Sequence, residues 1–247
     1  MNLSPEYDIE LEAMLARLGA TPGVGPSLLT GFWPMTGLAY SNGLMVVGRA
    51  VNGWIDHISA PDLADATART QLRASMRRTA EGDGQCPMRW VTDAWGRRGG
   101  YSTATSAFWR HIRTVLAAIE PASAGDPRWS SRLTWTNLAK IAPAGGGNPR
   151  GPLLQVQREI GPALLARELD EWNPSRVLVL TGRWWFEPFA EYLGLAVDWQ
   201  AGLVEGVADD GSRRWVIAPH PQGKPRRIHA DVIAAFGRSG AWRPERP

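Results

Sequence analysis

Four short apolar runs, each ended by Gly, Asn or Pro, constrain the fold of this 247-residue chain more than any other feature. They are rich in β-branched residues and do not alternate with polar positions, which is typical of strands buried on both faces of a sheet. Segments with helical periodicity separate them, so strands and helices alternate along the chain. The four runs are Leu44–Gly48, Leu133–Asn137, Val177–Gly182 and Trp215–Pro219.

This alternation predicts an α/β fold, because a crossover helix between consecutive strands makes them parallel. We expect a single domain over residues 1–247, with a central, mainly parallel four-stranded sheet flanked by helices. A further helix is expected over Pro5–Leu18, and Gly161-Pro162 is expected to kink or break the helix between the second and third runs. The alternative for the end of the sheet is a hairpin of Leu203–Val207 with Trp215–Ala218.

Composition excludes several classes of protein. The hydrophobic content of 44% excludes a disordered chain, and no apolar run is long enough for a membrane span. The lone Cys86 excludes an intramolecular disulfide, an iron–sulfur cluster and a zinc site of the usual thiolate type. We therefore expect no metal and no cofactor. Residues 1–20 carry no export signal, and we expect a cytoplasmic monomer without a membrane partner.

Polar and basic residues follow directly after each of the four runs. In an open parallel sheet the ligand lies outside the carboxyl ends of the strands, so these residues are expected to converge on one crevice. His220 is the most informative, because a histidine held at the end of a buried strand is a common acid, base or hydrogen-bond donor. The residues concerned are Gly48–Gly53, Asn137–Lys140, Gly182-Arg183 and His220-Pro221.

The segment Trp135–Pro149 (WTNLAKIAPAGGGNP) resembles a motif of the uracil-DNA glycosylase superfamily, most closely that of its bacterial and archaeal branches. Those branches carry T-N-x-x-K-x-x-P-P-x-x-N-x-x-P after the second buried strand, and His220-Pro221 lies where the family has H-P-S. The likeness follows the order of elements over residues 44–236. The chain departs from the family at Ala50, where Asp or Asn is usual, at Gln222 in place of Ser, and in having no iron–sulfur cysteines.

The resemblance implies a monofunctional, metal-independent DNA glycosylase of base excision repair. Such an enzyme flips uracil out of single- or double-stranded DNA and hydrolyses its N-glycosidic bond, which leaves an abasic site. The amide of Asn137 offers a donor and an acceptor side by side, which complements O4 and N3–H of uracil. Cytosine has a donor at position 4 and an acceptor at position 3, so it does not match an amide held in this orientation. His220 corresponds to the family's histidine, which donates a hydrogen bond to O2 as negative charge develops on the leaving base.

The resemblance also implies an aromatic residue that stacks on the base, residues that line the pocket and a group that holds the attacking water. Trp54 and Tyr101 are the two candidates for stacking on the flipped base, and Gly48 and Ala50 are expected to line the pocket. The water that attacks the sugar needs a polar group to hold it. The candidates for that group are Asn52, Asp56 and Asp93.

Basic residues are expected to contact the DNA phosphates, which would make the affinity depend on salt. Lys140 lies within the asparagine motif, and three more basic residues follow His220, where the family has a loop that enters the DNA. These three are Lys224, Arg226 and Arg227. The arginines at helical spacing within residues 59–101 form either a DNA-facing lid or an ordinary surface.

Two other functions remain open. Because Ala50 replaces the family's usual acidic or amide residue, the alternative is a catalytically inactive module of the same fold that binds a nucleobase or damaged DNA. A third interpretation is an unrelated small-molecule hydrolase, because Gly100–Ala104 half-resembles a nucleophile elbow centred on Ser102.

Overall fold

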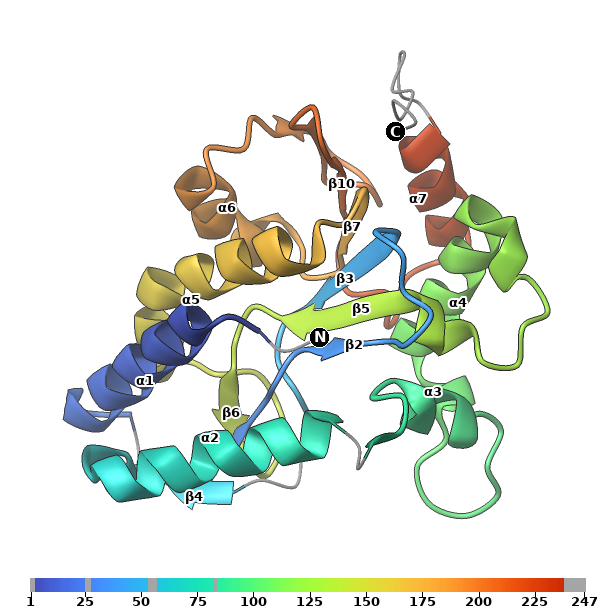
Figure 1. Ribbon diagram of the computed structural model, residues 1–247. Coiled ribbons are helices and arrows are strands. Elements are labelled where there is room, and N and C mark those ends of the chain that lie inside the picture. Colours follow the sequence, from blue (N-terminus) through green and yellow to red (C-terminus); the bar gives the residue numbers. More distant parts are fainter. Residues whose placement is uncertain (1–2, 25–27, 53–56, 82–83, 238–247) are drawn as a thin grey trace.

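The computed structural model describes residues 3–24, 28–52, 57–81 and 84–237. The four apolar runs form the centre of one sheet in the order β5–β3–β7–β10, and neighbouring strands of this group are parallel, as predicted (Figure 1). Their bounds are Leu44–Gly48 for β3, Leu133–Asn137 for β5, Arg176–Val179 for β7 and Arg214–Ile217 for β10.

The whole sheet is mixed and has seven strands within the described residues, so the expectation of a four-stranded sheet is wrong. At one edge β2 (Met35–Thr36) pairs antiparallel with β5. At the other edge β9 (Gly206–Asp209) pairs antiparallel with β10, and β8 (Asp198–Trp199) pairs with β9. The β9–β10 pair confirms the hairpin that was the alternative for the end of the sheet. β2 and β8 have two residues each and therefore leave no apolar run in the sequence.

A smaller antiparallel sheet has the order β4–β1–β6. Its strands are β1 (Leu28–Gly31), β4 (His57–Ser59) and β6 (Ile141–Pro143). β6 begins soon after β5 ends, and the N–H of Phe32, just after β1, donates to the C=O of Lys140 at 2.8 Å. The small sheet thus holds the chain where it leaves the Asn137 end of the large sheet.

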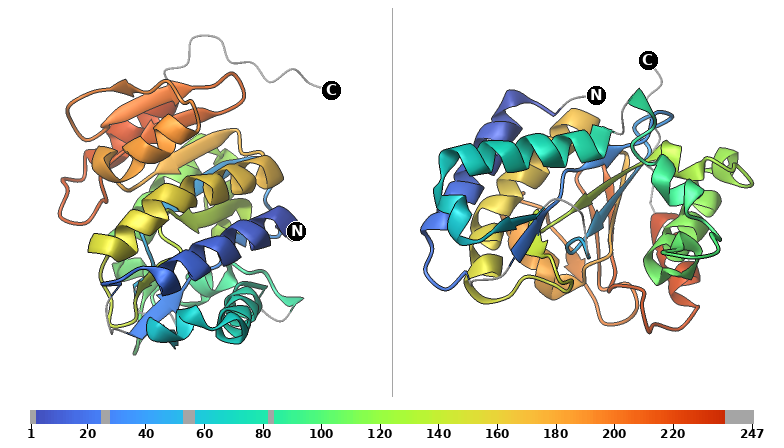
Figure 2. Two further views of the ribbon diagram at one scale, coloured as in Figure 1. Left: turned by 90° about the vertical axis from the view of Figure 1, so that its left-hand side faces the viewer. Right: turned by 90° about the horizontal axis from the view of Figure 1, so that it is seen from below.

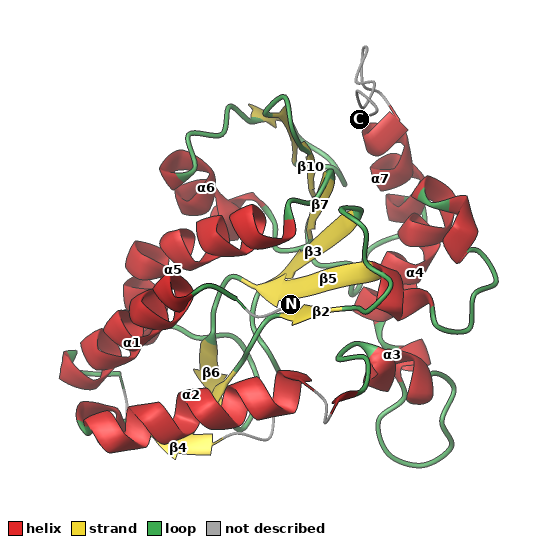
Figure 3. Cartoon of the chain, in the orientation of Figure 1, coloured by secondary structure: helices red, strands yellow, loops and turns green. Residues whose placement is uncertain are grey.

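Helices cover both faces of the large sheet (Figures 2 and 3). They are α1 (Pro5–Ala20), α2 (Ala66–Glu81), α3 (Arg89–Asp93), α4 (Ala107–Ile119), α5 (Gly151–Trp172), α6 (Arg183–Tyr192) and α7 (Ile228–Gly237), with short 3-10 helices at Pro61–Ala64, Thr103–Thr105, Pro121–Ser123 and Trp129–Arg132. α5 and α6 pack together on one face, and α4 and α7 pack together on the other. α1 packs on α5, which confirms the expected N-terminal helix, and the elements form one compact domain.

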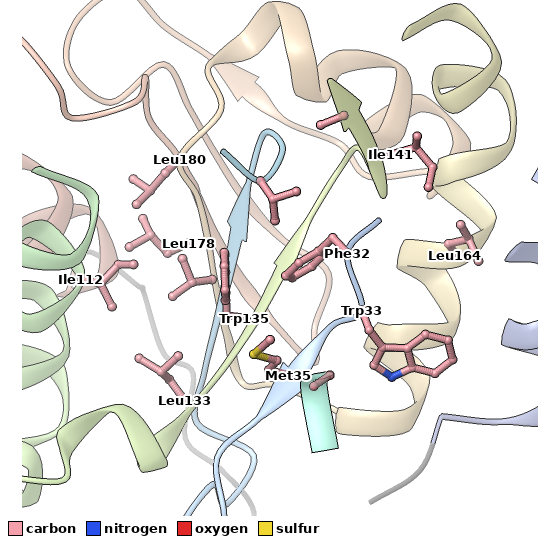
Figure 4. Close-up of a cluster of buried hydrophobic side chains, with 14 of the residues drawn as sticks. Phe32, Trp33, Met35, Ile112, Leu133, Trp135, Ile141, Leu164, Leu178 and Leu180 are labelled. Carbon is pink, nitrogen blue, oxygen red and sulfur yellow. The ribbon is translucent and has the colours of Figure 1, made fainter. Parts of the chain in front are cut away.

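Side chains of the central strands alternate between two apolar clusters, one on each face of the sheet. On β3, Met45 and Val47 belong to the cluster that includes α5 and α6, whereas Leu44 and Val46 belong to the cluster that includes α4 and α7. Figure 4 shows part of the second cluster, which contains Trp135 of β5. Burial on both faces explains why these strands read as continuous apolar runs.

The Gly161-Pro162 pair does not break its helix, which leaves a kink as the remaining part of the prediction. α5 continues through it, and both residues are buried. A proline inside a helix costs about 3 kcal/mol, whereas full burial of one large apolar side chain contributes about 1.5–3 kcal/mol. The buried apolar residues on the two sides of the pair therefore outweigh the missing hydrogen bond. They include Leu153, Val156, Leu164, Leu165 and Leu169.

Candidate active site

A cavity of about 1150 Å³ lies at the carboxyl ends of β3 and β5. Its walls come from the ends of these two strands, the start of α4, the residues just before α5 and the segment between β10 and α7. Asn137 and His220 both line it, as the convergence of strand ends predicted, whereas Gly182 and Arg183 do not, so that part of the prediction is wrong. The polar lining residues that matter most for its chemistry are Arg49, Asn52, Arg110, Asn137, Asn148 and His220.

Asn137 ends β5, and it is only 2% exposed. It is the register partner of Gly48 on β3, and a Cβ on Gly48 would lie 2.2 Å from Asn137 Oδ1. The carboxamide thus occupies the space that a side chain at position 48 would need. Its Nδ2 is buried and has no hydrogen-bond partner among the described residues. A residue of the cavity lining therefore has a buried amide donor that no described group uses.

Lys140 does not reach the surface, so the expectation that it contacts DNA is wrong. Its side chain is 1% exposed, and its ammonium group lies 2.6 Å from the carboxylate of Glu168, a buried residue of α5. Burial lowers the pKa of Lys140, and the carboxylate of Glu168 opposes this shift. The ammonium group also donates to Thr136 Oγ1 and to the C=O of Asn137, both at 2.7 Å. Lys140 is thus a buried support for the end of β5.

His220 is half-buried just beyond β10. Its Nδ1 accepts a hydrogen bond from the backbone N–H of Gln222 at 3.2 Å, so the proton of the neutral ring lies on Nε2. Burial, and after it the positive charge of Arg49, lower the pKa of His220 below its usual value of 6.5. The imidazole is therefore neutral at pH 7 and has an N–H donor on the edge opposite Gln222.

Phe108 is a site residue that the sequence did not reveal. It lies in the first turn of α4, and its ring is nearly parallel to that of His220, with 5.8 Å between the centroids and 11° between the planes. Its Cζ would be 3.5 Å from a Cβ on Gly48, which is also the position that Asn137 approaches. One aromatic ring thus borders both polar groups. In the sequence Phe108 is one more apolar position of an amphipathic helix.

The loop after β3 contributes Ala50 and Asn52 to the lining, together with Gly48, as expected. Asn52 Oδ1 accepts a hydrogen bond from the N–H of Gly147 at 3.1 Å, which joins this loop to the one before α5. That second loop also places Asn148 in the lining. Asn148 belongs to the sequence motif, but the spacing of the motif gave it no role.

None of the described residues that line the cavity is Asp or Glu. Asp93 does not line it and forms an exposed ion pair with Arg89 at 2.9 Å, so its candidacy for holding water is wrong. Asp56 and Trp54 lie outside the described residues. The described part of the lining therefore offers no carboxylate that could position a water molecule.

The basic segment that follows His220 is exposed at Lys224, Arg226 and Arg227. Gln222 and Gly223, which lie between His220 and this segment, line the cavity, so these basic side chains lie close to its mouth. Tyr101 also lines the cavity and is 58% exposed, which places it at the rim. Its ring is therefore far more exposed than the side chain of Asn137, which is buried.

Three of the four arginines of α2 face α1. Arg69 and Arg73 pair with Glu12 at 2.7 Å and 3.2 Å, and Arg77 pairs with Asp8. These ion pairs use the charges within the protein. These contacts favour the interpretation of this cluster as an ordinary surface over that of a DNA-facing lid.

Ser102 does not line the cavity, and its hydroxyl accepts a hydrogen bond from the N–H of Gly96 at 3.1 Å. It precedes a short 3-10 helix, whereas a nucleophile elbow joins a buried strand to a helix. The hydrolase interpretation therefore has no structural support.

Other classes of site and other proteins give no further assignment. The described ranges contain no group of three or more His, Cys, Asp and Glu side chains that could hold a metal ion. None of the helices within these ranges is both long enough and apolar enough to cross a membrane. No protein-family model matches the chain, and no curated protein matches it.

Proposed function

We propose that this chain is a uracil-DNA glycosylase, a monofunctional enzyme of base excision repair on a uracil-DNA glycosylase-like α/β fold. The observation that carries the proposal is that Asn137 and His220 line one cavity, the first with a buried and unused amide donor and the second as a neutral imidazole. Both groups also match the residues that carry the sequence resemblance.

The pairing edge of uracil fits the Asn137 carboxamide. Nδ2–H would donate to O4 of uracil, and Oδ1 would accept from N3–H. Cytosine presents a donor and an acceptor in the opposite order, so both contacts would fail and buried polar groups would be left unpaired. Each unpaired group costs about 1–3 kcal/mol. The tight contact with Gly48 restricts rotation of the amide, which this selection requires.

His220 is suited to stabilise the leaving base. As the bond between C1′ and N1 breaks, its electron pair passes to the base, and negative charge develops at N1 and O2. A neutral Nε2–H directed at O2 would form a stronger hydrogen bond in the transition state than in the bound substrate. Removal of one such donor typically lowers the rate by two to three orders of magnitude.

The sugar left behind is cation-like and combines with water at C1′, which releases a proton to the solvent. Asn52 and Asn148 are the described groups that could position this water. No lysine occurs among the described lining residues, so no described amine is placed to form a covalent adduct with the sugar. These features support simple hydrolysis, and Phe108 is the best candidate in the described lining for packing against the flipped base.

The test is release of the free base. Purified protein is incubated in excess with oligonucleotides that contain a single uracil, thymine or cytosine, in single-stranded and double-stranded form. Free uracil is measured by mass spectrometry, and abasic sites are measured by alkaline cleavage. We expect uracil release and strand cleavage from the uracil substrates only. Absence of both products at high enzyme excess would refute the proposed activity.

The second candidate is a non-catalytic module that binds a nucleobase in DNA. The observation that favours it is the absence of a carboxylate from the described lining, together with Ala50 at the expected position of an acidic or amide residue. Tighter binding to uracil-containing DNA than to the thymine control, without base release, would establish this alternative. Turnover would exclude it.

A further inference from the structure

A second, smaller cavity of about 190 Å³ lies between the start of α4 and the segment that leads into α7, two helices that pack side by side (Figure 1). Ala107 and Arg110 line both cavities, so the two adjoin each other. The segment after β10 also divides them, because His220 and Gln222 line the large cavity whereas Pro221 lines the small one. A ligand held in both would cross this segment.

The small cavity is strongly basic. Arg110, Lys224, Arg226 and His229 line it, and no Asp or Glu is among its described lining residues. None of the ion pairs found within the described residues involves Arg110, Lys224 or Arg226, in contrast to the paired arginines of α2. Three like charges around one small space repel each other, and an anion between them would relieve this repulsion.

Two of these side chains are already held in place. The Nη1 of Arg110 donates to the C=O groups of Ala104 and Thr105 at 3.0 Å and 2.8 Å, which leaves Nη2 and Nε for a ligand. The Nδ1 of His229 lies 2.8 Å from the Nδ1 of the buried His111, so only its Nε2 edge can serve the cavity. Arg110 and Arg226 line the cavity together with His229, and burial, followed by their charges, lowers the pKa of His229.

We propose that this small cavity is a phosphate-binding site. A volume of about 190 Å³ corresponds to about six water molecules at about 30 Å³ each, which is enough for a phosphate group but not for a complete nucleotide. Guanidinium groups bind phosphate oxygens through paired, charge-assisted hydrogen bonds, and the lysine adds a point charge. On the proposed function, on which this assignment of the ligand rests, the bound group is a backbone phosphodiester next to the flipped nucleotide.

The test measures phosphate binding without any base excision. Inorganic phosphate is titrated into the full-length protein at constant ionic strength, and the imidazole signals of His229 are followed by NMR. We expect a saturable shift in the wild type, and a dissociation constant at least fivefold higher in Arg226→Ala. Arg17→Ala is the control, because Arg17 is exposed on α1 and lines neither cavity, and we expect a change within twofold.

Lys224→Gln is a second variant, because Lys224 makes no side-chain hydrogen bond within the described residues, whereas Arg110 also anchors the loop before α4. A uracil-free oligothymidylate provides the phosphodiester arm. In Lys224→Gln and Arg226→Ala, the salt dependence of its binding should fall by about 0.7 in log–log slope for each lost contact. Equal effects of Arg226→Ala and Arg17→Ala on phosphate binding, or no saturable shift of His229, would overturn the site.

The two arms also separate this inference from the proposed function. If phosphate and oligothymidylate bind as expected but no uracil is released, the glycosylase proposal fails and the phosphate site stands. If uracil is released but phosphate does not saturate the His229 signals, the phosphate site fails alone.

Discussion

The position of the Asn137 amide depends on the absence of a Cβ atom at Gly48. A Cβ at position 48 would lie 2.2 Å from Asn137 Oδ1, and Phe108 approaches the same point to 3.5 Å. A Cβ so close to an oxygen is not tolerated, so one of the two groups would have to move. Gly48 is therefore a condition for the observed position of the Asn137 amide, although it contributes no functional group.

We predict that Gly48→Ala lowers the rate of uracil excision about a hundredfold, because a displacement of about 1 Å at a reacting group typically costs that much. The measurement is the single-turnover rate at saturating DNA. Gly145→Ala is the matched control, since no atom lies within 4 Å of a Cβ at that position and its backbone is not left-handed. Equal rates for the two variants would show that the amide does not depend on Gly48.

Single residues were predictable where their chemistry is local. Asn137 and His220 each follow a buried strand, and that position alone brings them to one cavity. Lys140 was not predictable, because its partner Glu168 lies on a helix far along the chain, and burial of the pair is a tertiary property. The role of Phe108 likewise depends on where the first turn of α4 meets the sheet.

At the scale of the elements, the Lys140–Glu168 ion pair joins the segment just after β5 to α5, and Tyr7 of α1 is buried beside the pair. Burial raises the pKa of Glu168, and Lys140 acts in the opposite direction. Without Lys140, the carboxylate would be left buried and uncompensated. The pair therefore links three elements at the end of the strand that carries Asn137.

We predict that Lys140→Met lowers the free energy of unfolding by about 3–5 kcal/mol, because it leaves one buried charge unpaired. The double variant Lys140→Met/Glu168→Leu should recover most of this loss. Urea denaturation measures both. Arg89→Ala, which breaks the exposed pair with Asp93, is the control and should cost less than about 1 kcal/mol. A Lys140→Met variant as stable as this control would contradict the account.

Elements were predictable to the extent that their apolar pattern is continuous. The four central strands show it because both of their faces are buried, and α4 and α7 show a helical period. β2 and β8 are too short for any pattern, and they become strands only because a longer neighbour offers a free edge. In the same way, α5 continues through Pro162 because the tertiary contacts of the helix outweigh the tendency of proline to interrupt it.

At the scale of the whole molecule, His111 makes stability depend on pH. Its ring is completely buried at the contact between α4 and α7, where it faces His229. Burial, followed by the nearby His229 and His220, lowers the pKa of His111 to about 3. Below pH 6.5 the unfolded chain binds a proton at this residue that the folded protein does not bind. The free energy of unfolding must therefore fall as the pH falls from 6.5 towards 3.

We predict that this one residue lowers the free energy of unfolding by about 2 kcal/mol between pH 6.5 and pH 5, at about 1.4 kcal/mol per pH unit. In His111→Gln the loss over this range should be smaller by that amount. Urea denaturation of both proteins at the two pH values measures it. If both proteins lose the same stability, His111 is not buried in its neutral form.

The central claim is that His220 acts on a nucleobase selected by Asn137 in one shared cavity. The most direct test is the single-turnover rate of uracil release at saturating DNA, for the wild type, His220→Ala and the control His57→Ala, whose histidine is exposed and does not line the cavity. We predict a loss of two to three orders of magnitude for His220→Ala and a rate within about twofold for His57→Ala. Equal rates in all three proteins, or no uracil release by the wild type, would contradict the account.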